Sequence, residues 1–239
     1  EQQSCATDLE AGTNEGRTEM KYVLVALALA ALCVPAVAQV GDNPDIKIFI
    51  HLTDDADPPV LPTDNATVVN EFSPAAFTTI RAYVGLTGFA TGMTVISFRL
   101  NDAVSDCPGV MATQAFVNLL PGGLAIGNAF GDPGNPGSGT DGVTLASSEC
   151  MPGFYDIVLV GYAEYFYLGG ECQIEILDHG YAEYARWVVD CQTPGVVNLY
   201  CVWLNGGVGG ATPPAGDVGC EANTPVEDAT WTLIKALYR

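Results

Sequence analysis

Two histidines, His51 and His179, are the only imidazole side chains available to a catalytic site in this chain. His51 lies between apolar neighbours in a segment with strand periodicity, and His179 lies between Asp178 and Gly180 in a predicted turn. Hydrolytic triads need a base beside a nucleophile, and the sequence contains no Gly-x-Ser-x-Gly motif. It also lacks a Cys-x-x-Cys motif, which disfavours a zinc knuckle or a redox centre. We therefore expect no enzymatic activity.

Paired carboxylates leave one enzymatic alternative, a carboxylate-dependent glycoside hydrolase. The candidate acidic residues near aromatic side chains are Glu164, Glu171, Glu175 and Glu183. Any acidic β-protein offers such pairs by chance, so this alternative ranks last among the functions considered.

Clustered aspartates make calcium the one cofactor that the sequence suggests. Asp54, Asp55 and Asp57 share one loop, and Asp132 and Asp141 bracket another. Calcium prefers several oxygen ligands that converge from a loop. No Asp-x-Asp-x-Asp-Gly loop is present, so Asp54, Asp55 and Asp57 form only a weak candidate site.

Aromatic residues give the clearest indication of binding. Tyrosine and tryptophan present flat apolar faces with a polar group, which suits sugar rings and protein partners. The candidate ligand-binding residues are Tyr162, Tyr165, Tyr167, Tyr181, Tyr184 and Trp187. Aromatic residues also favour strands, so core packing is the alternative interpretation.

The charge balance limits the partners. The chain has 28 acidic and 8 basic residues, with a formal net charge of −20. Such a surface repels phosphate backbones and anionic lipid headgroups. We therefore expect no nucleic-acid binding and no membrane association beyond an export signal.

The segment from Met20 to Gln39 has the three parts of a secretory signal peptide. Met20 and Lys21 are followed by an apolar run, and Ala36–Ala38 supplies the small-x-small cleavage pattern. We predict a signal peptide at 20–38, an over-extended reading frame at 1–19 and a mature, secreted chain with a net charge of −17. Lipoprotein processing at Cys33 is the minor alternative, because Leu32 precedes it where a small residue is expected.

Short alternating segments after Asp45 predict an all-β domain at 39–223. Ile46, Ile48, Ile50 and Leu52 have the period of two that marks a strand with one apolar face. About nine such strands separated by turn signals predict an antiparallel β-sandwich. The predicted strands are 45–52, 78–86, 93–100, 112–120, 124–130, 143–147, 154–168, 172–177, 186–190 and 196–204. The glycine-rich segment 131–142 is predicted to be a long loop.

Six cysteines follow the predicted cleavage site, and an even number in a secreted chain indicates disulfides. If 172–177 and 186–191 form an antiparallel hairpin, Cys172 faces Cys191. Cys107–Cys150 and Cys201–Cys220 are then the simplest remaining pairs. The C-terminal segment 224–239 begins with a capping box and is predicted to be a helix or an exposed tail.

Residues 78–100 resemble the start of a cohesin-like or carbohydrate-binding-module-like sandwich, in which a strand leads through a glycine-rich turn into a second strand. The whole chain also resembles uncharacterised secreted bacterial proteins. The resemblance implies an immunoglobulin- or cohesin-like sandwich. It also implies export.

We thus expect a non-enzymatic binding or adhesion module, secreted or at the cell surface. Its partner would be a glycan or a protein, and a carbohydrate would bind through the tyrosine and tryptophan cluster. The alternative is a structural subunit of an extracellular assembly that associates with itself through an open sheet edge.

Overall fold

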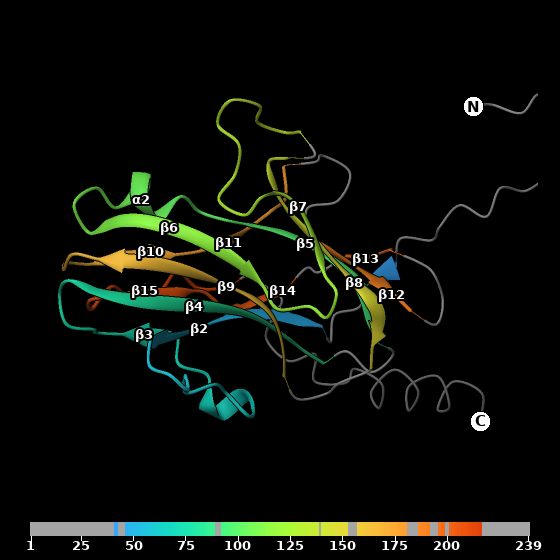
Figure 1. Cartoon of the computed structure of the whole chain (residues 1–239), viewed down its shortest axis with the longest axis horizontal. Helices are drawn as coiled ribbons and strands as arrows, with labels where there is room; N and C mark the ends of the chain where they lie inside the picture. The colour runs from blue at the N-terminus through green and yellow to red at the C-terminus, as the bar shows by residue number, and fades with distance from the viewer. Residues whose placement is uncertain are drawn as a thin grey trace, which may run out of the picture. The chain divides into compact units, whose positions relative to one another are not determined.

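The computed structural model describes residues 41–42, 46–88, 92–138, 140–152, 157–180, 186–191, 196–198 and 201–216. Within these ranges the chain is mostly β-strand, with a short 3-10 helix η1 (Asn65–Thr67) and a short helix α2 (Ala103–Asp106). Figure 1 shows the course of the strands. Most of them belong to two sheets, named sheet A and sheet B below.

Sheet B is the five-stranded sheet. Its spatial order is β14 (Cys201–Leu204), β2 (Lys47–Asp54), β4 (Thr78–Thr87), β9 (Val158–Tyr167) and β6 (Met111–Asn118). β14 pairs with β2 in parallel, and the other neighbours are antiparallel. Ile48, Ile50 and Leu52 of β2 are buried, as the period of two predicts for the inner face of a half-buried strand.

Sheet A forms the opposite layer. Its order is β1 (Gly41–Asp42), β13 (Val196–Asn198), β12 (Trp187–Asp190), β5 (Met93–Leu100), β8 (Gly142–Met151) and β7 (Leu124–Asn128). β11 (Ile176–Leu177) also pairs with β5. Ile96 and Phe98 of β5 and Leu145 of β8 are fully buried, so the inner face of sheet A is as apolar as that of sheet B.

The inner faces of the two sheets share one core. Buried side chains from β2, β4, β5, β8, β9 and β12 form a single cluster. Phe98 of sheet A meets Phe116 of sheet B edge to face, with 6.0 Å between ring centroids. A small third sheet of β10 (Cys172–Ile174), β15 (Gly206–Val208) and β3 (Glu71–Phe72) adds Cys172, Ile174 and Val208 to this core. Two sheets that pack over a common core make a β-sandwich.

The predicted fold class is therefore confirmed. Nine strands of four or more residues occur in the described ranges, and β5 has the predicted bounds, Met93–Leu100. The glycine-rich segment is the predicted loop, between β7 and β8. The signal peptide at 20–38, the preceding residues 1–19 and the C-terminal segment 224–239 lie outside the described residues. None of the helices described here has the length and apolar composition needed to cross a membrane.

The pairing of the cysteines differs from the predicted one. Cys107 is bonded to Cys172, and Cys150 is bonded to Cys191. The predicted pairs Cys172–Cys191 and Cys107–Cys150 are wrong. Cys201 is also disulfide-bonded, and its predicted partner Cys220 lies outside the described residues.

The reason is that 172–177 and 186–191 do not pair with each other. β10 pairs with β15, whereas β11 and β12 both pair with β5. The chain thus leaves the small sheet after Ile174 and enters sheet A at Ile176. Local periodicity located the extended segments, but the predicted single strand 172–177 is two strands, and the pattern did not show which neighbour each would pair with.

His51, on the outer face of sheet B, forms hydrogen bonds with the long connection after β2. The backbone N–H of Val69 donates to Nδ1 of His51 at 3.0 Å, so the ring hydrogen is on Nε2, which lies 3.0 Å from the carbonyl oxygen of Val60. The ring is 2% exposed. Burial lowers the pKa of His51 below its ordinary value of 6.5, against the opposing effect of the Val60 carbonyl. The imidazole is thus neutral at neutral pH and has a structural role.

Acidification is expected to destabilise the fold through this histidine. Because the pKa of His51 is lower in the folded state, the unfolded chain takes up the proton first as the pH falls below 6.5. Burial lowers the pKa of His179 in the same direction. Thermal melting between about pH 7.5 and pH 5 should show a falling Tm. His51→Gln, which does not titrate, should make this fall shallower, and an unchanged slope would contradict the assignment.

Candidate functional site

The run of residues between Asp106 and Asp132 contains no charged residue and no histidine, in a chain with a net charge of −20. This run forms β6, β7 and the connection between them. β6 ends the spatial order of sheet B, and β7 ends that of sheet A. End strands usually carry charges or proline that prevent pairing with other strands. Neither β6 nor β7 contains either kind of residue.

β7 is exposed along its whole length. The side chain of Leu124 is 58% exposed and that of Ile126 is 51% exposed. β7 pairs with β8 on one side, with Leu124 opposite Ala146 and Ile126 opposite Thr144. Among the described strands, none pairs with its other edge. Both the outer face of β7 and one edge of its backbone therefore reach solvent.

Strand register extends this apolar surface across sheet A. One row runs from Leu124 through Ala146 and Val95 to Val189, and the next runs from Ile126 through Thr144 and Ser97 to Trp187. These side chains point away from the core, because their neighbours Ile96, Leu145 and Val188 are buried on the inner face. We call the residues of these two rows the uncharged face.

Most of the uncharged face is accessible. Val95, Thr144, Ala146, Trp187 and Val189 are partly exposed. Ser97 is buried, and its hydroxyl lies 2.6 Å from that of Thr144. One of the two hydroxyls donates a hydrogen bond to the other in the centre of the face.

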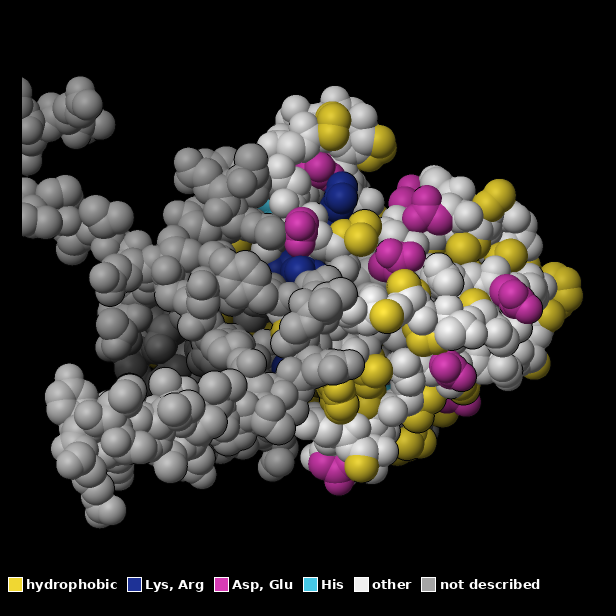
Figure 2. Space-filling model, turned by 180° about the vertical axis from the view of Figure 1, so that it is seen from behind, with side chains coloured by type: hydrophobic (Ala, Val, Ile, Leu, Met, Phe, Trp, Pro, Cys, Tyr) yellow, Lys and Arg dark blue, Asp and Glu magenta, His cyan; other side chains and the backbone are white. Residues whose placement is uncertain are grey.

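The other exposed large hydrophobic side chains lie on loops or on sheet B. Val60, Leu61, Val69, Phe77 and Leu119 are exposed on loops, and Val117 of β6 and Phe166 of β9 are exposed on sheet B. Figure 2 shows, on the side of the molecule that it presents, acidic side chains spread over the surface with hydrophobic ones between them. Single exposed apolar residues of this kind are normal on soluble proteins. Two adjacent rows on a regular sheet are a more specific feature.

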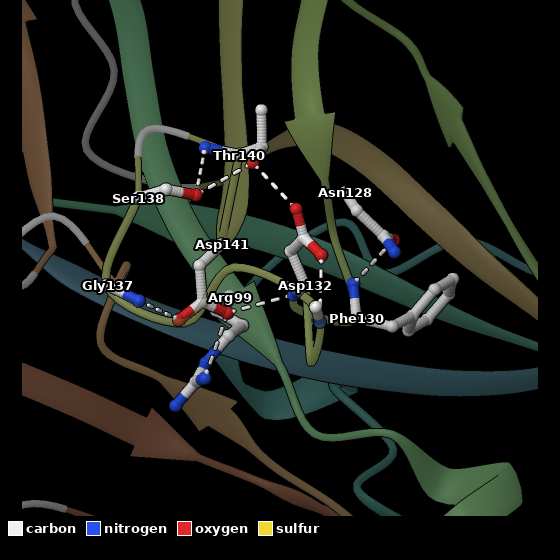
Figure 3. A network of polar contacts seen from close by, with 9 residues as sticks. Arg99, Asn128, Phe130, Asp132, Gly137, Ser138, Thr140 and Asp141 are labelled. Atoms are coloured by element: carbon white, nitrogen blue, oxygen red, sulfur yellow. Dashed lines mark hydrogen bonds and ion pairs between the residues drawn. The ribbon is translucent and has the colours of Figure 1, made fainter.

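An ion pair between the partly exposed Arg99 and the buried Asp141 borders the uncharged face. Arg99 follows Ser97 on the outer face of β5, and its Nη1 donates to Oδ1 of Asp141 at 3.2 Å. Asp141 is 4% exposed and also accepts the backbone N–H groups of Asp132 at 3.0 Å and Gly137 at 2.8 Å. Figure 3 shows these contacts converging on the Asp141 carboxylate. They hold the 131–141 loop in place beside β7.

The electrostatics of this loop follow from the same contacts. The N–H of Gly137 is the main cause that lowers the pKa of Asp141, with further contributions from the N–H of Asp132 and from Arg99, against the opposing effect of burial. Asp141 is therefore charged at neutral pH. The backbone N–H of Gly180 donates to the backbone carbonyl oxygen of Asp141 at 2.6 Å. This hydrogen bond connects the loop to the segment after β11.

Two pockets near this network have acidic linings. One of about 270 Å³ is lined in part by Asp102, Asp106 and Asp132. The other, of about 450 Å³, is lined in part by Asp106, Glu171 and Glu175. In the described part of the chain, no three His, Cys, Asp or Glu side chains are grouped so that they could hold a metal ion.

Of the acidic residues singled out in the sequence, Glu171 and Glu175 line one pocket, and others lie elsewhere on the fold. Asp54 accepts the N–H of Ala56 at the end of β2, and Asp55 and Asp57 are exposed on the following loop. Glu164 pairs with Arg81 at 3.1 Å on the outer face of sheet B. Glu183 lies outside the described residues. Calcium binding at Asp54, Asp55 and Asp57 stays a prediction.

The predicted aromatic residues are dispersed. Tyr165 and Tyr167 are buried in the core, at 0% and 3% exposure. Tyr162 lies on the outer face of sheet B, where its ring packs against Tyr83 with 5.0 Å between centroids. Trp187 lies on the outer face of sheet A. Tyr181 and Tyr184 are outside the described residues. The described members of the group thus form no single aromatic surface.

Replacing Tyr165 by phenylalanine is expected to stabilise the fold by about 1 kcal/mol. The buried hydroxyl of Tyr165 has no hydrogen-bond partner among the described residues, so its removal ends an uncompensated desolvation cost. Tyr167→Phe is the matched control, because that hydroxyl donates to the carbonyl oxygen of Gly170 at 2.8 Å. Urea denaturation should show opposite signs for the two variants, and a destabilised Tyr165→Phe would contradict the expectation.

The residues of the uncharged face were missed in the sequence, apart from Trp187. Attention to single residue types favoured aromatic and acidic side chains. The signal that could have identified β7, with Leu124 and Ile126, is an absence, namely the long interval without charge between Asp106 and Asp132. It becomes informative once its strands are known to end both sheets.

No protein-family model matches the chain, and no curated protein matches it in sequence. Solved structures do match. CaCohA2 from Clostridium acetobutylicum has a TM-score of 0.38 and 8% identity over 68% of this chain and 90% of that chain. A non-cellulosomal cohesin from Archaeoglobus fulgidus has a TM-score of 0.36 and 12% identity over 69% and 89%. The seventh ScaB type I cohesin from Pseudobacteroides cellulosolvens has a TM-score of 0.34 and 7% identity over 71% and 92%.

The chain resembles cohesins. Two of these structures are cohesins, the family that residues 78–100 resemble in sequence. At TM-scores below 0.5 the similarity concerns the general arrangement of the sandwich and identifies no binding residue.

Proposed function

We propose that this chain is a non-enzymatic, extracellular binding module whose partner is a protein, and that the uncharged face of sheet A binds this partner. The observation that carries the proposal is the exposure of Leu124 and Ile126 on an end strand without charge. A surface without charge is unusual in a chain with a net charge of −20.

The composition of the face suits protein recognition. The centres of protein interfaces are depleted in charged residues and enriched in aromatic ones. Trp187 lies at one end of a row and Ile126 at the other, with two hydroxyl residues between them. Burying Leu124 and Ile126 against a partner would remove apolar surface that is now in water, which favours association.

A protein partner is preferred to a glycan because of where the aromatic rings lie. Carbohydrate binding by the tyrosine and tryptophan group would need exposed rings on one surface. Tyr165 and Tyr167 are buried, and Tyr162 and Trp187 belong to different sheets. An extracellular location is supported by the disulfides Cys107–Cys172 and Cys150–Cys191, together with the predicted signal peptide at 20–38.

Selection of linear peptides from a phage-displayed random library against the purified chain tests the proposal. We expect enriched apolar peptides whose affinity falls at least about tenfold in Ile126→Lys. Val60→Lys is the matched control, because Val60 is 74% exposed on the loop after β2. Peptides that bind wild type and Ile126→Lys equally would overturn the assignment of the face.

A further inference from the structure

We infer that Asn65 is the acceptor site for an N-linked glycan that is added when the chain is exported. The inference goes beyond the proposed function and shares with it only the extracellular location. Asn65, Ala66 and Thr67 form an Asn-x-Thr tripeptide whose middle residue is not proline. This tripeptide is the acceptor motif for N-glycosylation of secreted proteins. No other asparagine of the chain is followed two positions later by serine or threonine.

The structure places this motif where an acceptor has to lie. The three residues form η1, in the connection between β2 and β3. All three are exposed. N-linked glycans are bulky and lie on protein surfaces. A glycan attached to Asn65 would therefore extend into solvent and displace no part of the core.

The side chain of Asn65 is not needed to form the turn. Oδ1 of Asp64 accepts the N–H groups of Ala66 at 2.9 Å and of Thr67 at 3.0 Å. Oγ1 of Thr67 accepts the N–H groups of Thr63 at 2.9 Å and of Asp64 at 3.1 Å. Within the described part of the chain, the amide group of Asn65 has no hydrogen-bond partner. Its nitrogen can carry a sugar while the turn keeps every one of these hydrogen bonds.

Other asparagines have a structural role that Asn65 lacks. The side chains of Asn101, Asn118, Asn128 and Asn205 each form a hydrogen bond with the backbone of another residue. Modification of such a side chain would break a contact of the fold. The one asparagine that has the acceptor motif is thus also one that the fold leaves free to react.

The reaction is the transfer of an oligosaccharide from a lipid diphosphate. Nδ2 of Asn65 forms a bond to C1 of the first sugar and loses one proton. The bond between C1 and the diphosphate oxygen breaks, and the lipid diphosphate leaves with its electron pair. In the folded chain the hydroxyl of Thr67 is engaged, because it also donates to the carbonyl oxygen of Asp64 at 2.9 Å. We therefore expect the transfer to take place during export, before the turn forms.

The position of the glycan is compatible with partner binding at the uncharged face. The hydrogen bonds of His51 hold the same connection against the outer face of sheet B. The uncharged face is the outer face of sheet A, and the outer faces of two packed sheets point in opposite directions. The connection also carries the exposed apolar side chains of Val60, Leu61 and Val69. A hydrophilic glycan beside them favours solubility.

The intact mass of the chain produced in a mammalian cell line tests the inference. The host's own signal sequence replaces residues 1–38, and the chain is recovered from both cells and medium. We expect a single glycan that peptide-N-glycosidase removes, which leaves an aspartate at position 65. Asn65→Gln and Thr67→Val should carry no glycan, whereas Thr67→Ser should keep it. Asn70→Gln is the matched control and should keep the glycan, because Asn70 lies in the same connection outside the motif.

A wild-type chain without a glycan would overturn the inference, and so would a glycan that persists in Asn65→Gln. These outcomes are independent of the proposed function. Peptide binding that depends on Ile126 should be equal for the glycosylated wild type and for Asn65→Gln. A chain without a glycan that still binds peptides in this way would overturn the acceptor site alone. A glycosylated chain whose peptide binding is insensitive to Ile126→Lys would support the acceptor site and overturn the assignment of the uncharged face.

Discussion

Replacing Cys107 and Cys172 together by alanine is expected to lower the free energy of unfolding by about 2–5 kcal/mol. The bond joins residues separated by 65 positions and connects the C-cap residue of α2 to β10 of the small third sheet. Without the disulfide, this long loop is no longer closed in the unfolded chain. The unfolded state therefore gains conformational entropy, which lowers the free energy of unfolding. The buried position of Cys172 adds lost packing, since this residue belongs to the core.

Urea denaturation of the double variant measures this loss. The matched control replaces Cys150 and Cys191, which close a shorter loop of 41 positions and link β8 to the residue after β12. Both of those strands also pair with β5, so the second loss should be the smaller. Peptide mapping without reduction should recover Cys107 linked to Cys172. A recovered Cys172–Cys191 peptide would contradict the fold described here.

Asp141→Asn is expected to cost about 2–4 kcal/mol and to release the 131–141 loop. The carboxylate accepts N–H donors on both oxygens, from Arg99 and Asp132 on one and from Gly137 on the other. An amide group has only one acceptor atom, so one of these donors would face an NH₂ group. The charge that pairs with Arg99 is lost as well.

Asp132→Asn is the matched control for this variant. Asp132 accepts from the N–H of Gly134 and the hydroxyl of Thr140, both neutral donors in an exposed part of the loop, so the expected cost is below about 1 kcal/mol. Chemical denaturation gives the free energies of unfolding of the two variants. The rate of hydrogen exchange at the Gly137 amide shows whether the 131–141 loop has been released. Equal effects of the two substitutions would contradict the central role of Asp141.

Much of the fold could be predicted from local pattern. The alternation of Ile46, Ile48, Ile50 and Leu52 identified β2, because a strand that is buried on one face repeats with a period of two. The pairing of strands could not be predicted in the same way. Ile174 and Ile176 belong to different sheets, and this choice depends on contacts with β15 and β5 that are distant in sequence.

The candidate site illustrates the same limit. Tyr165 and Trp187 look alike as exposed aromatic candidates in the sequence, yet Tyr165 lies in the core and Trp187 on an outer face. Leu124 and Ile126 look like core residues of a strand. They are exposed because β7 ends sheet A, a property of the assembled sheet and not of the strand.

The measurement that tests the account most directly is amide hydrogen exchange of the chain with and without a peptide selected against it. If the uncharged face is the binding surface, the peptide should slow exchange at Leu124–Asn128 and along β8, and Ile126→Lys should abolish this protection. Protection confined to the outer face of sheet B, around Thr79 and Phe166, would contradict the account.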